Sequence, residues 1–190
     1  MKNDVARDIS YATSASGLMG QLLIRSIENI TGRIALIKRA KDYDKEVAKG
    51  RNFWQVIVER YNIEMNIVKG SLKDIPKEGP VVIVSNHPFG ILDGLLMGYI
   101  LSKSRKDFKI IANRVFRKAK DLDNVVLPIS FEDNRVGNLQ NIKTRNEAID
   151  FLKAGGIVGI FPGGTVATSA RLFSRPLDPF WKRFTSKLIL

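Results

Sequence analysis

One histidine and one aspartate form the pair in this sequence whose types and spacing are suited to catalysis. His87 is the only histidine, and Asp93 follows it after five residues in the stretch VVIVSNHPFGILDG, residues 81–94. An imidazole held by a carboxylate can take a proton from a hydroxyl group, while the carboxylate orients the ring and stabilises its cation. A lone histidine can equally be a hydrogen-bonded structural residue, so the elements around the pair have to support the catalytic interpretation.

The elements that position this pair are a strand and a helix. Residues 81–84 are a continuous β-branched run after a Gly-Pro pair, which predicts a short strand buried on both faces. Pro88 suits the start of a helix, and residues 91–100 supply its apolar side chains. Ser85 is close enough to be a nucleophile, but the sequence lacks the Gly-x-Ser-x-Gly turn that such serines occupy.

A second strand is also followed by residues suited to binding. Residues 156–161 read as an apolar strand, and Pro-Gly-Gly-Thr follows at residues 162–165. Free backbone amides in such a turn can hold an anion. The turn is not a P-loop, because no lysine follows its glycines.

The motif of Asn-His-Pro, glycine and Asp-Gly resembles the catalytic block of the glycerolipid acyltransferases, the 1-acyl-glycerol-3-phosphate acyltransferase family. NHPFGILDG is most similar to the branch of putative hemolysins and lyso-ornithine lipid acyltransferases. The resemblance implies that His87 and Asp93 are catalytic. Here, however, the pair is separated by one residue more than in the main family, which rotates the carboxylate by about 100° on a regular helix. Asp93 can therefore face His87 only if the turn near Gly90 absorbs the difference.

The resemblance also implies substrate-binding residues. FPGGT is similar to the family's block Phe-Pro-Glu-Gly-Thr, with Gly163 at the glutamate position and Val166 where arginine is common. Gly163, Gly164 and Thr165 are the residues it implies, although only the last two match by identity and Thr165 is equally suited to stabilising the turn. The family's block after the strand at residues 108–112 helps to bind the acceptor's head group. Arg114 is therefore our first candidate for an anion contact, and Lys109 and Arg117 are weaker ones.

The composition restricts the chemistry and the partners. The 190 residues include 31 Lys and Arg against 19 Asp and Glu, a formal net charge of +12, so the surface favours polyanions. Nucleic acid and an anionic membrane both fit this charge; the resemblance favours the membrane, and we expect no nucleic-acid partner. The absence of cysteine excludes disulfides and thiolate nucleophiles, and a single histidine makes a zinc site improbable. No cofactor or metal is expected.

Strand and helix patterns alternate from residue 51 onward, which predicts an α/β fold with a mixed, mainly parallel sheet covered by helices. We predict helices over residues 53–61 and 138–153 and further strands over residues 63–68 and 125–129. Apolar residues at three- and four-residue steps over residues 18–37 predict an amphipathic helix, suited either to a core or to a membrane interface. The expected organisation is an N-terminal amphipathic helical segment, residues 1–50, and an acyltransferase-like domain, residues 51–190. That domain is expected to be incomplete, because residues 81–190 resemble the family's first three blocks and nothing remains for the fourth.

The function implied by the resemblance is transfer of a fatty acyl group to a lysolipid hydroxyl in membrane lipid synthesis. The donor would be an acyl thioester of acyl carrier protein or coenzyme A, and His87 would be the general base. Lysophosphatidate and lyso-ornithine lipid are the acceptors considered, and the expected location is peripheral, at the cytoplasmic face of the membrane. The alternative is a non-catalytic basic module that binds membranes or nucleic acid, derived from a truncated or decayed acyltransferase.

Overall fold

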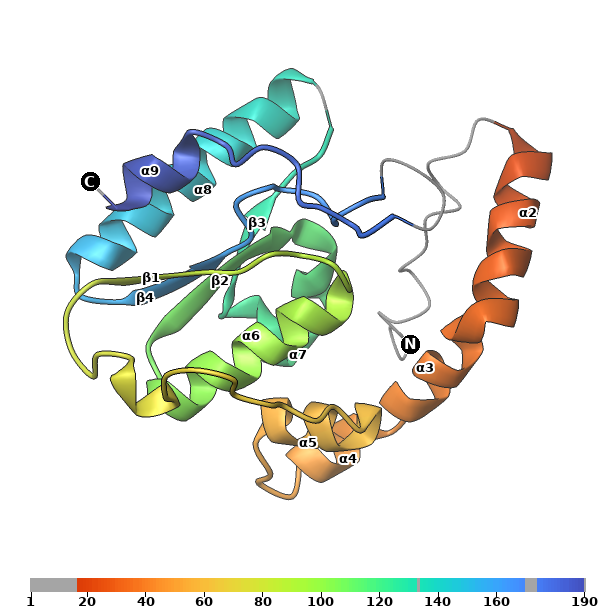
Figure 1. Ribbon diagram of the computed structural model, residues 1–190, viewed down its shortest axis with the longest axis horizontal. Coiled ribbons are helices and arrows are strands. Elements are labelled where there is room, and N and C mark those ends of the chain that lie inside the picture. Colours follow the sequence, from red (N-terminus) through yellow and green to blue (C-terminus); the bar gives the residue numbers. More distant parts are fainter. Residues whose placement is uncertain (1–16, 133, 170–173, 190) are drawn as a thin grey trace. The chain divides into compact units, whose positions relative to one another are not determined.

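The computed structural model describes residues 17–132, 134–169 and 174–189 and divides the chain into two compact units (Figure 1). The first unit is Met1–Met65 and the second is Asn66–Leu190. Residues 1–16 of the predicted N-terminal segment lie outside the described residues. The predicted domain boundary after residue 50 stays a prediction.

The first unit is built from short helices. In chain order they are α2 (Leu18–Glu28), the π-helical turn η2 (Asn29–Arg33), α3 (Ile34–Ala40), α4 (Tyr43–Val47) and α5 (Phe53–Tyr61). The helix predicted over residues 18–37 is present but kinked, because Gly32 has a non-helical φ of 115°. No residue of α2 or α3 is fully buried.

The packed part of the first unit lies around α5. The predicted helix over residues 53–61 is confirmed, and its buried residues are Phe53, Trp54, Val56 and Ile57. At its other end Arg60 Nε donates to Glu46 Oε1 over 2.8 Å, which ties α5 to α4. The hydrogen bond from Arg60, with a smaller contribution from Arg51, lowers the pKa of the Glu46 carboxyl.

The second unit contains the sheet. Its elements are η3 (Leu72–Asp74), β1 (Val81–Val84), α6 (Ile91–Ser104), β2 (Phe108–Asn113), η4 (Arg114–Lys118), α7 (Lys120–Asp123), β3 (Val126–Ile129), α8 (Arg135–Lys153), β4 (Ile157–Ile160) and α9 (Phe184–Ile189). The four strands are ordered β1-β4-β2-β3, and each neighbouring pair is parallel. The predicted α/β class with a mainly parallel sheet is confirmed.

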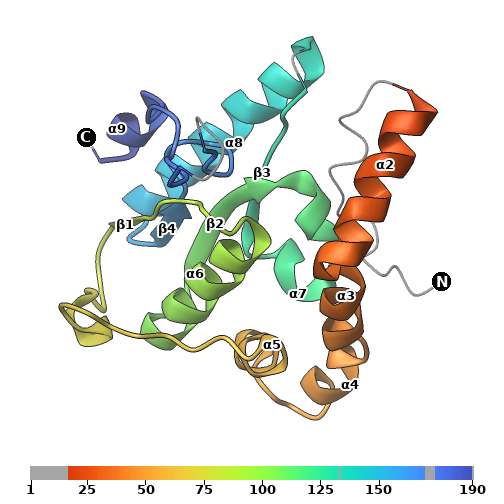
Figure 2. The same ribbon diagram turned by 45° about the vertical axis from the view of Figure 1, so that its right-hand side comes forward.

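Helices cover both faces of this sheet, with α6 on one side and α8 and α9 on the other (Figures 1 and 2). Alternate residues of β4 point to opposite faces. Val158 and Ile160 belong to the core cluster under α8 and α9, whereas a Cβ at Gly159 would lie only 2.5 Å from Met97 Sδ of α6. Glycine at position 159 therefore lets α6 pack closely on the sheet.

Arg105 holds together the edge of the sheet where the strands begin. Its Nη1 donates to the Gly79 carbonyl over 2.7 Å, and its Nη2 donates to the Gly155 carbonyl. Its Nε donates to Asp107 Oδ1 over 2.8 Å, and this guanidinium lowers the pKa of the Asp107 carboxyl. Because Gly79, Gly155 and Asp107 precede β1, β4 and β2, one side chain connects the entries to three strands.

The strand predicted over residues 63–68 is wrong. These residues form no helix or strand, and Ile67 and Val68 are exposed. Alternating apolar residues form a strand only where a sheet edge can pair with them, and none of the described strands pairs with this stretch. The tail also contains a helix, α9, which the sequence pattern did not predict.

Candidate active site

The junction between β1 and α6 carries His87, three residues after the last residue of β1. The Ser85 N–H extends the ladder by donating to the Ile160 carbonyl of β4 over 3.3 Å. The chain then turns at Gly90, whose φ of 61° and ψ of −118° suit glycine because it has no Cβ. The Gly90 carbonyl accepts from the Asp93 N–H over 3.1 Å, so Asp93 lies in the first turn of α6.

The side chains of His87 and Asp93 are in contact. His87 Nδ1 lies 3.0 Å from Asp93 Oδ2, and the two side chains are 18% and 13% exposed. The same carboxylate oxygen accepts from the Phe89 N–H over 2.7 Å. The turn at Gly90 therefore absorbs the extra residue between the two, as the spacing required.

This contact determines which ring nitrogen is available for chemistry. A carboxylate can only accept, so the neutral imidazole carries its proton on Nδ1 and leaves the lone pair on Nε2. Nε2 can then take a proton from a hydroxyl group, and Asp93 stabilises the cation that forms. The arrangement is that of a general base with an orienting carboxylate; the catalytic role of both residues stays a prediction.

Three further contacts hold His87, and the sequence pattern predicted none of them. Its ring stacks on Phe161, with ring centroids 4.1 Å apart and planes inclined by 21°. Its N–H donates to Asp178 Oδ1 over 3.0 Å, and its carbonyl accepts from the Ala167 N–H over 2.8 Å. The loop after β4 and the chain near Asp178 therefore fix the backbone of the histidine on both sides.

The turn after β4 is covered by a stretch that we call the 174–182 segment. Thr168 and Leu177 pair through two backbone hydrogen bonds, and the Lys182 N–H donates to the Pro162 carbonyl over 3.0 Å. A Cβ at Gly163 would lie 3.0 Å from Pro179 Cδ. Pro179 thus occupies the space that a larger residue at position 163 would need, which is a physical reason for glycine where the family's block has glutamate.

The three cations predicted to contact an anion each have a partner within the fold. Arg114 begins η4 after β2, is 58% exposed, and its guanidinium is paired with Glu132. Arg117 is paired with Asp123 over 2.7 Å, and Lys109 donates to the Asn124 carbonyl. Of the predicted set, Gly164 is linked to His87 through Phe161, whose carbonyl accepts from the Gly164 N–H and whose ring stacks on His87. Thr165 is exposed. The binding roles of Arg114, Gly163, Gly164 and Thr165 stay predictions.

Two alternative chemistries find little support in the geometry. The Ser85 hydroxyl donates to the Asn86 carbonyl over 2.9 Å, and within the described part of the chain it has no hydrogen bond to His87. Among residues 17–132, 134–169 and 174–189, no three His, Cys, Asp or Glu side chains are grouped closely enough to hold a metal ion. The same residues include no helix that is long and apolar enough to cross a membrane.

Comparison with known proteins identifies the family of the chain. Residues 66–180 match the family model described as Acyltransferase. Because the match covers more than half of the chain, including both strand-end turns, the protein belongs to the acyltransferase family.

Two curated relatives are both lyso-glycine lipid O-acyltransferases. The chain is 30% identical over 105 residues to the protein from Bacteroides thetaiotaomicron, covering 55% of this chain and 34% of that one. It is 28% identical over 148 residues to the protein from Phocaeicola vulgatus, covering 77% of this chain and 50% of that one. The chain thus spans half or less of the relatives' length. No solved structure matches the chain significantly.

Proposed function

We propose that this protein transfers a fatty acyl group from an acyl thioester to the hydroxyl of a lysolipid, with His87 as the general base. The observation that carries the proposal is the 3.0 Å contact between His87 Nδ1 and Asp93 Oδ2, which leaves Nε2 as the base in a chain of the acyltransferase family. The donor would be the thioester of acyl carrier protein or coenzyme A.

The proposed reaction needs one nucleophile and one proton carrier. The lysolipid hydroxyl oxygen attacks the thioester carbonyl carbon while Nε2 of His87 takes its proton. The carbon–oxygen bond forms, the carbon–sulfur bond breaks, and the departing sulfur receives the proton, so the products are an ester and a thiol. General-base assistance of this kind contributes roughly 10²- to 10⁴-fold to the rate. No side chain needs to be acylated.

We propose an amino-acid lysolipid as the acceptor. Both relatives are named for a lyso-glycine lipid. The turn after β4 also lacks the charged side chains of the phosphate-binding block in the family that this sequence resembles, since Gly163 and Val166 are neutral. A phosphate monoester is best held by arginine together with backbone amides. The acceptors predicted from the sequence, lysophosphatidate and lyso-ornithine lipid, therefore belong in the same test.

The test is an acyl-transfer assay with labelled donors. The chain is incubated with acyl carrier protein or coenzyme A thioesters and with lyso-glycine lipid, lyso-ornithine lipid or lysophosphatidate. We expect acylated amino-acid lipid from the wild type and no product above background from a folded His87→Ala variant. Transfer that survives in His87→Ala would refute the role of the base. Absence of transfer with every pair of substrates, in a folded protein that still binds vesicles, would favour a non-catalytic membrane module.

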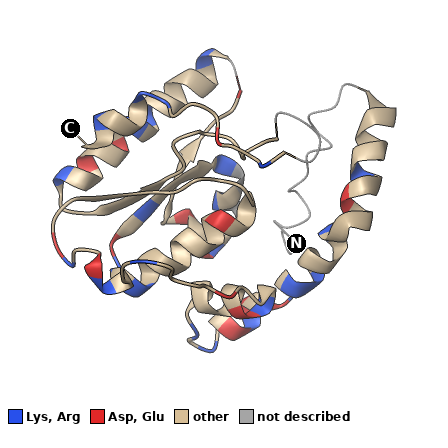
Figure 3. Cartoon of the chain, in the orientation of Figure 1, with Lys and Arg blue, Asp and Glu red and all other residues tan. Residues whose placement is uncertain are grey.

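A peripheral membrane location, at the cytoplasmic face, is part of this proposal. In the first unit α2 exposes Leu18, Met19 and Leu22, and Lys and Arg lie on the neighbouring α3 (Figure 3). Apolar side chains next to basic ones suit an anionic lipid interface.

Vesicle binding tests the proposed location. Deleting residues 1–40 is expected to weaken binding to vesicles that contain anionic lipid, and added salt is expected to weaken the rest by screening. Equal binding to neutral and anionic vesicles would contradict the electrostatic part of the proposal. Tighter binding to duplex DNA than to vesicles would contradict the membrane location itself.

A further inference from the structure

We propose that Lys182 and the turn at Gly163 and Gly164 form a binding site for the carboxylate of the acceptor's head group. This inference rests on the proposed function, because it names the head group that the same site would take. Lys182 lies beyond residues 66–180, the part of the chain that matches the family model, so the match assigns it no role. The observations that select it are its position on the turn, its connection to His87 and its lack of an acidic partner.

The ammonium end of Lys182 lies against the backbone of the turn. A Cβ at Gly164 would be 3.1 Å from Lys182 Cε and 3.4 Å from its Nζ, and Gly164 has a φ of 77°. The backbone of Lys182 is anchored by its own N–H, which donates to the Pro162 carbonyl over 3.0 Å. The lysine stem therefore packs where any side chain at position 164 would stand, which keeps a positive charge beside the glycines.

This charge is connected to the catalytic histidine from two directions. The Gly164 N–H donates to the Phe161 carbonyl over 3.0 Å, and the Phe161 ring stacks on His87. Asp178, four residues before Lys182 in the 174–182 segment, accepts from the His87 N–H. A lysolipid whose hydroxyl is at Nε2 of His87 would thus have its head group within reach of this turn.

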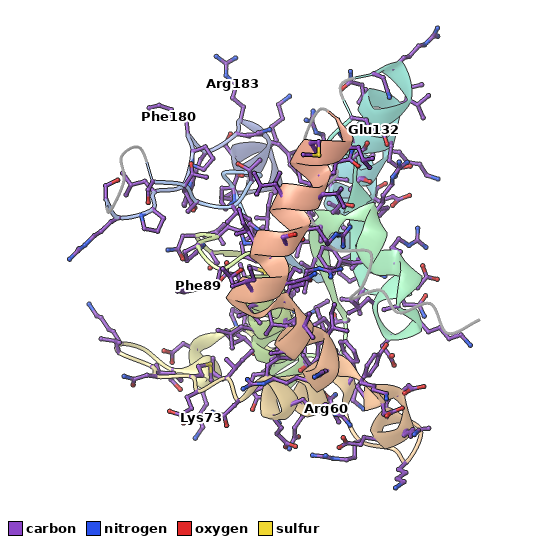
Figure 4. All side chains as sticks on the ribbon, turned by 90° about the vertical axis from the view of Figure 1, so that its right-hand side faces the viewer. Arg60, Lys73, Phe89, Glu132, Phe180 and Arg183 are labelled. Carbon is purple, nitrogen blue, oxygen red and sulfur yellow. The ribbon has the colours of Figure 1, made fainter. Side chains whose placement is uncertain are left out.

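Among the described residues, Lys182 has no acidic partner, in contrast to three arginines of the second unit. Arg105, Arg114 and Arg117 are each paired with a carboxylate, whereas no ion pair or hydrogen bond occupies Lys182 Nζ in the described ranges of the chain. The neighbouring Arg183 points away from the ribbon (Figure 4). An ammonium without a partner is the group best prepared to receive an anion, since no existing pair has to be broken.

The charges around the site favour an anion with a single negative charge. One ammonium matches one carboxylate, and lysine acts as a point charge without the fork with which arginine holds phosphate. Two carboxylates, Asp93 and Asp178, contact the His87 residue and would repel a second negative charge nearby. An amino-acid head group, with one carboxylate, fits this balance better than a phosphate monoester.

Binding of small probes tests the site without requiring turnover. N-acetylglycine supplies the carboxylate, N-acetylglycinamide is its neutral counterpart, and inorganic phosphate is the competing anion. Each is titrated into the whole chain while the backbone amide signals of Gly163 and Gly164 are followed by NMR. Lys182→Met keeps the stem that packs on Gly164 and removes the charge, Lys182→Arg keeps the charge, and Arg183→Met is the matched control for loss of a neighbouring cation.

We expect N-acetylglycine, and not the neutral amide, to shift the two glycine signals in the wild type. Lys182→Met should weaken this binding about tenfold, as for loss of a hydrogen bond to a charged group, whereas Arg183→Met and Lys182→Arg should retain it. Equal binding by Lys182→Met, or no shift with N-acetylglycine in the wild type, would overturn the site. Tighter binding of phosphate through Lys182 would overturn its carboxylate specificity.

Kinetics with the lipid acceptor separate this inference from the proposed function. Lys182→Met should raise the KM for an amino-acid lysolipid about tenfold and leave kcat almost unchanged, because the contact is present in both ground state and transition state. Unchanged KM in Lys182→Met, with activity still abolished by His87→Ala, would refute the carboxylate site alone. Carboxylate binding through Lys182 in a chain without transferase activity would refute the proposed function alone.

Discussion

Replacing Asp93 by asparagine should cost far less activity than removing His87, because of one hydrogen bond from the backbone. Both His87 Nδ1 and the Phe89 N–H point at the same carboxylate oxygen, Oδ2. In Asp93→Asn the amide NH₂ cannot take that position, since it would face the Phe89 N–H, a donor. The amide carbonyl must occupy it instead, so the Nδ1–H tautomer of His87 is preserved.

The magnitude follows from what the asparagine still lacks. A hydrogen bond to a charged group contributes about 1.5–3 kcal/mol and a neutral one about 0.5–1.5 kcal/mol. The difference of about 1–1.5 kcal/mol lowers kcat roughly tenfold. His87→Ala removes the base itself and should lower kcat roughly 10²- to 10⁴-fold. In His87→Ala/Asp93→Asn the loss should equal that of His87→Ala, because Asp93 acts through the histidine.

The assay is a double-mutant cycle on kcat for acyl transfer, with circular dichroism to confirm that each variant is folded. A loss in Asp93→Asn as large as in His87→Ala would show that the amide is reversed and that the Phe89 N–H does not control its orientation. A loss of kcat in the double variant equal to the product of the two single losses would show that the two residues act independently. Either result would refute the reasoning from the shared oxygen.

Three other predictions concern the supports of the site and the stability of each unit. Arg105→Ala removes the donor to the Gly79 and Gly155 carbonyls and should lower the free energy of unfolding by about 2–4 kcal/mol. The control Lys106→Ala, at an exposed neighbour, should lower it by less than about 0.5 kcal/mol. Equal denaturation midpoints for the two variants would contradict the role of Arg105 in connecting the strand entries. Asp178→Ala should lower kcat roughly twofold to tenfold by freeing the His87 N–H, while Asp178→Asn, which keeps an acceptor oxygen, should have a kcat close to that of the wild type. Equal losses of kcat in both variants would show that this hydrogen bond is not the cause of the loss. The pKa of the Glu46 carboxyl is lowered in the folded chain, so the stabilisation from this carboxylate is present above its usual pKa of 4.5 and is lost as the pH falls below 4.5 through the pKa of the folded state. Glu46→Gln should therefore reduce the fall in melting temperature over that pH range. An unchanged fall would assign the acid sensitivity to other groups.

Local patterns in the sequence determined the second unit's main elements. The apolar run of β4 is a strand because such a segment is stable when buried on both faces of a parallel sheet. The β-branched run of β1 is also a strand, but it lies at the edge of the sheet with Val84 40% exposed, so its predicted burial on both faces is wrong. The pair of His87 and Asp93 was also predictable, since both residues belong to one strand-to-helix junction and only the turn at Gly90 had to place them. Their contact depends on six residues of chain, and local geometry suffices over that distance.

The tertiary structure decided what surrounds the pair. Asp178 contacts His87 across 91 positions of the sequence, and Phe161 reaches it because β4 lies beside β1 in the sheet. Periodicity says nothing about strand order, so neither residue could be assigned from its neighbours. The same holds for charges: Arg114 and Lys182 look alike in the sequence, but folding places a carboxylate, Glu132, against the first and a glycine backbone against the second. Which cation remains available to a ligand therefore depends on contacts between distant segments, which only the folded chain defines.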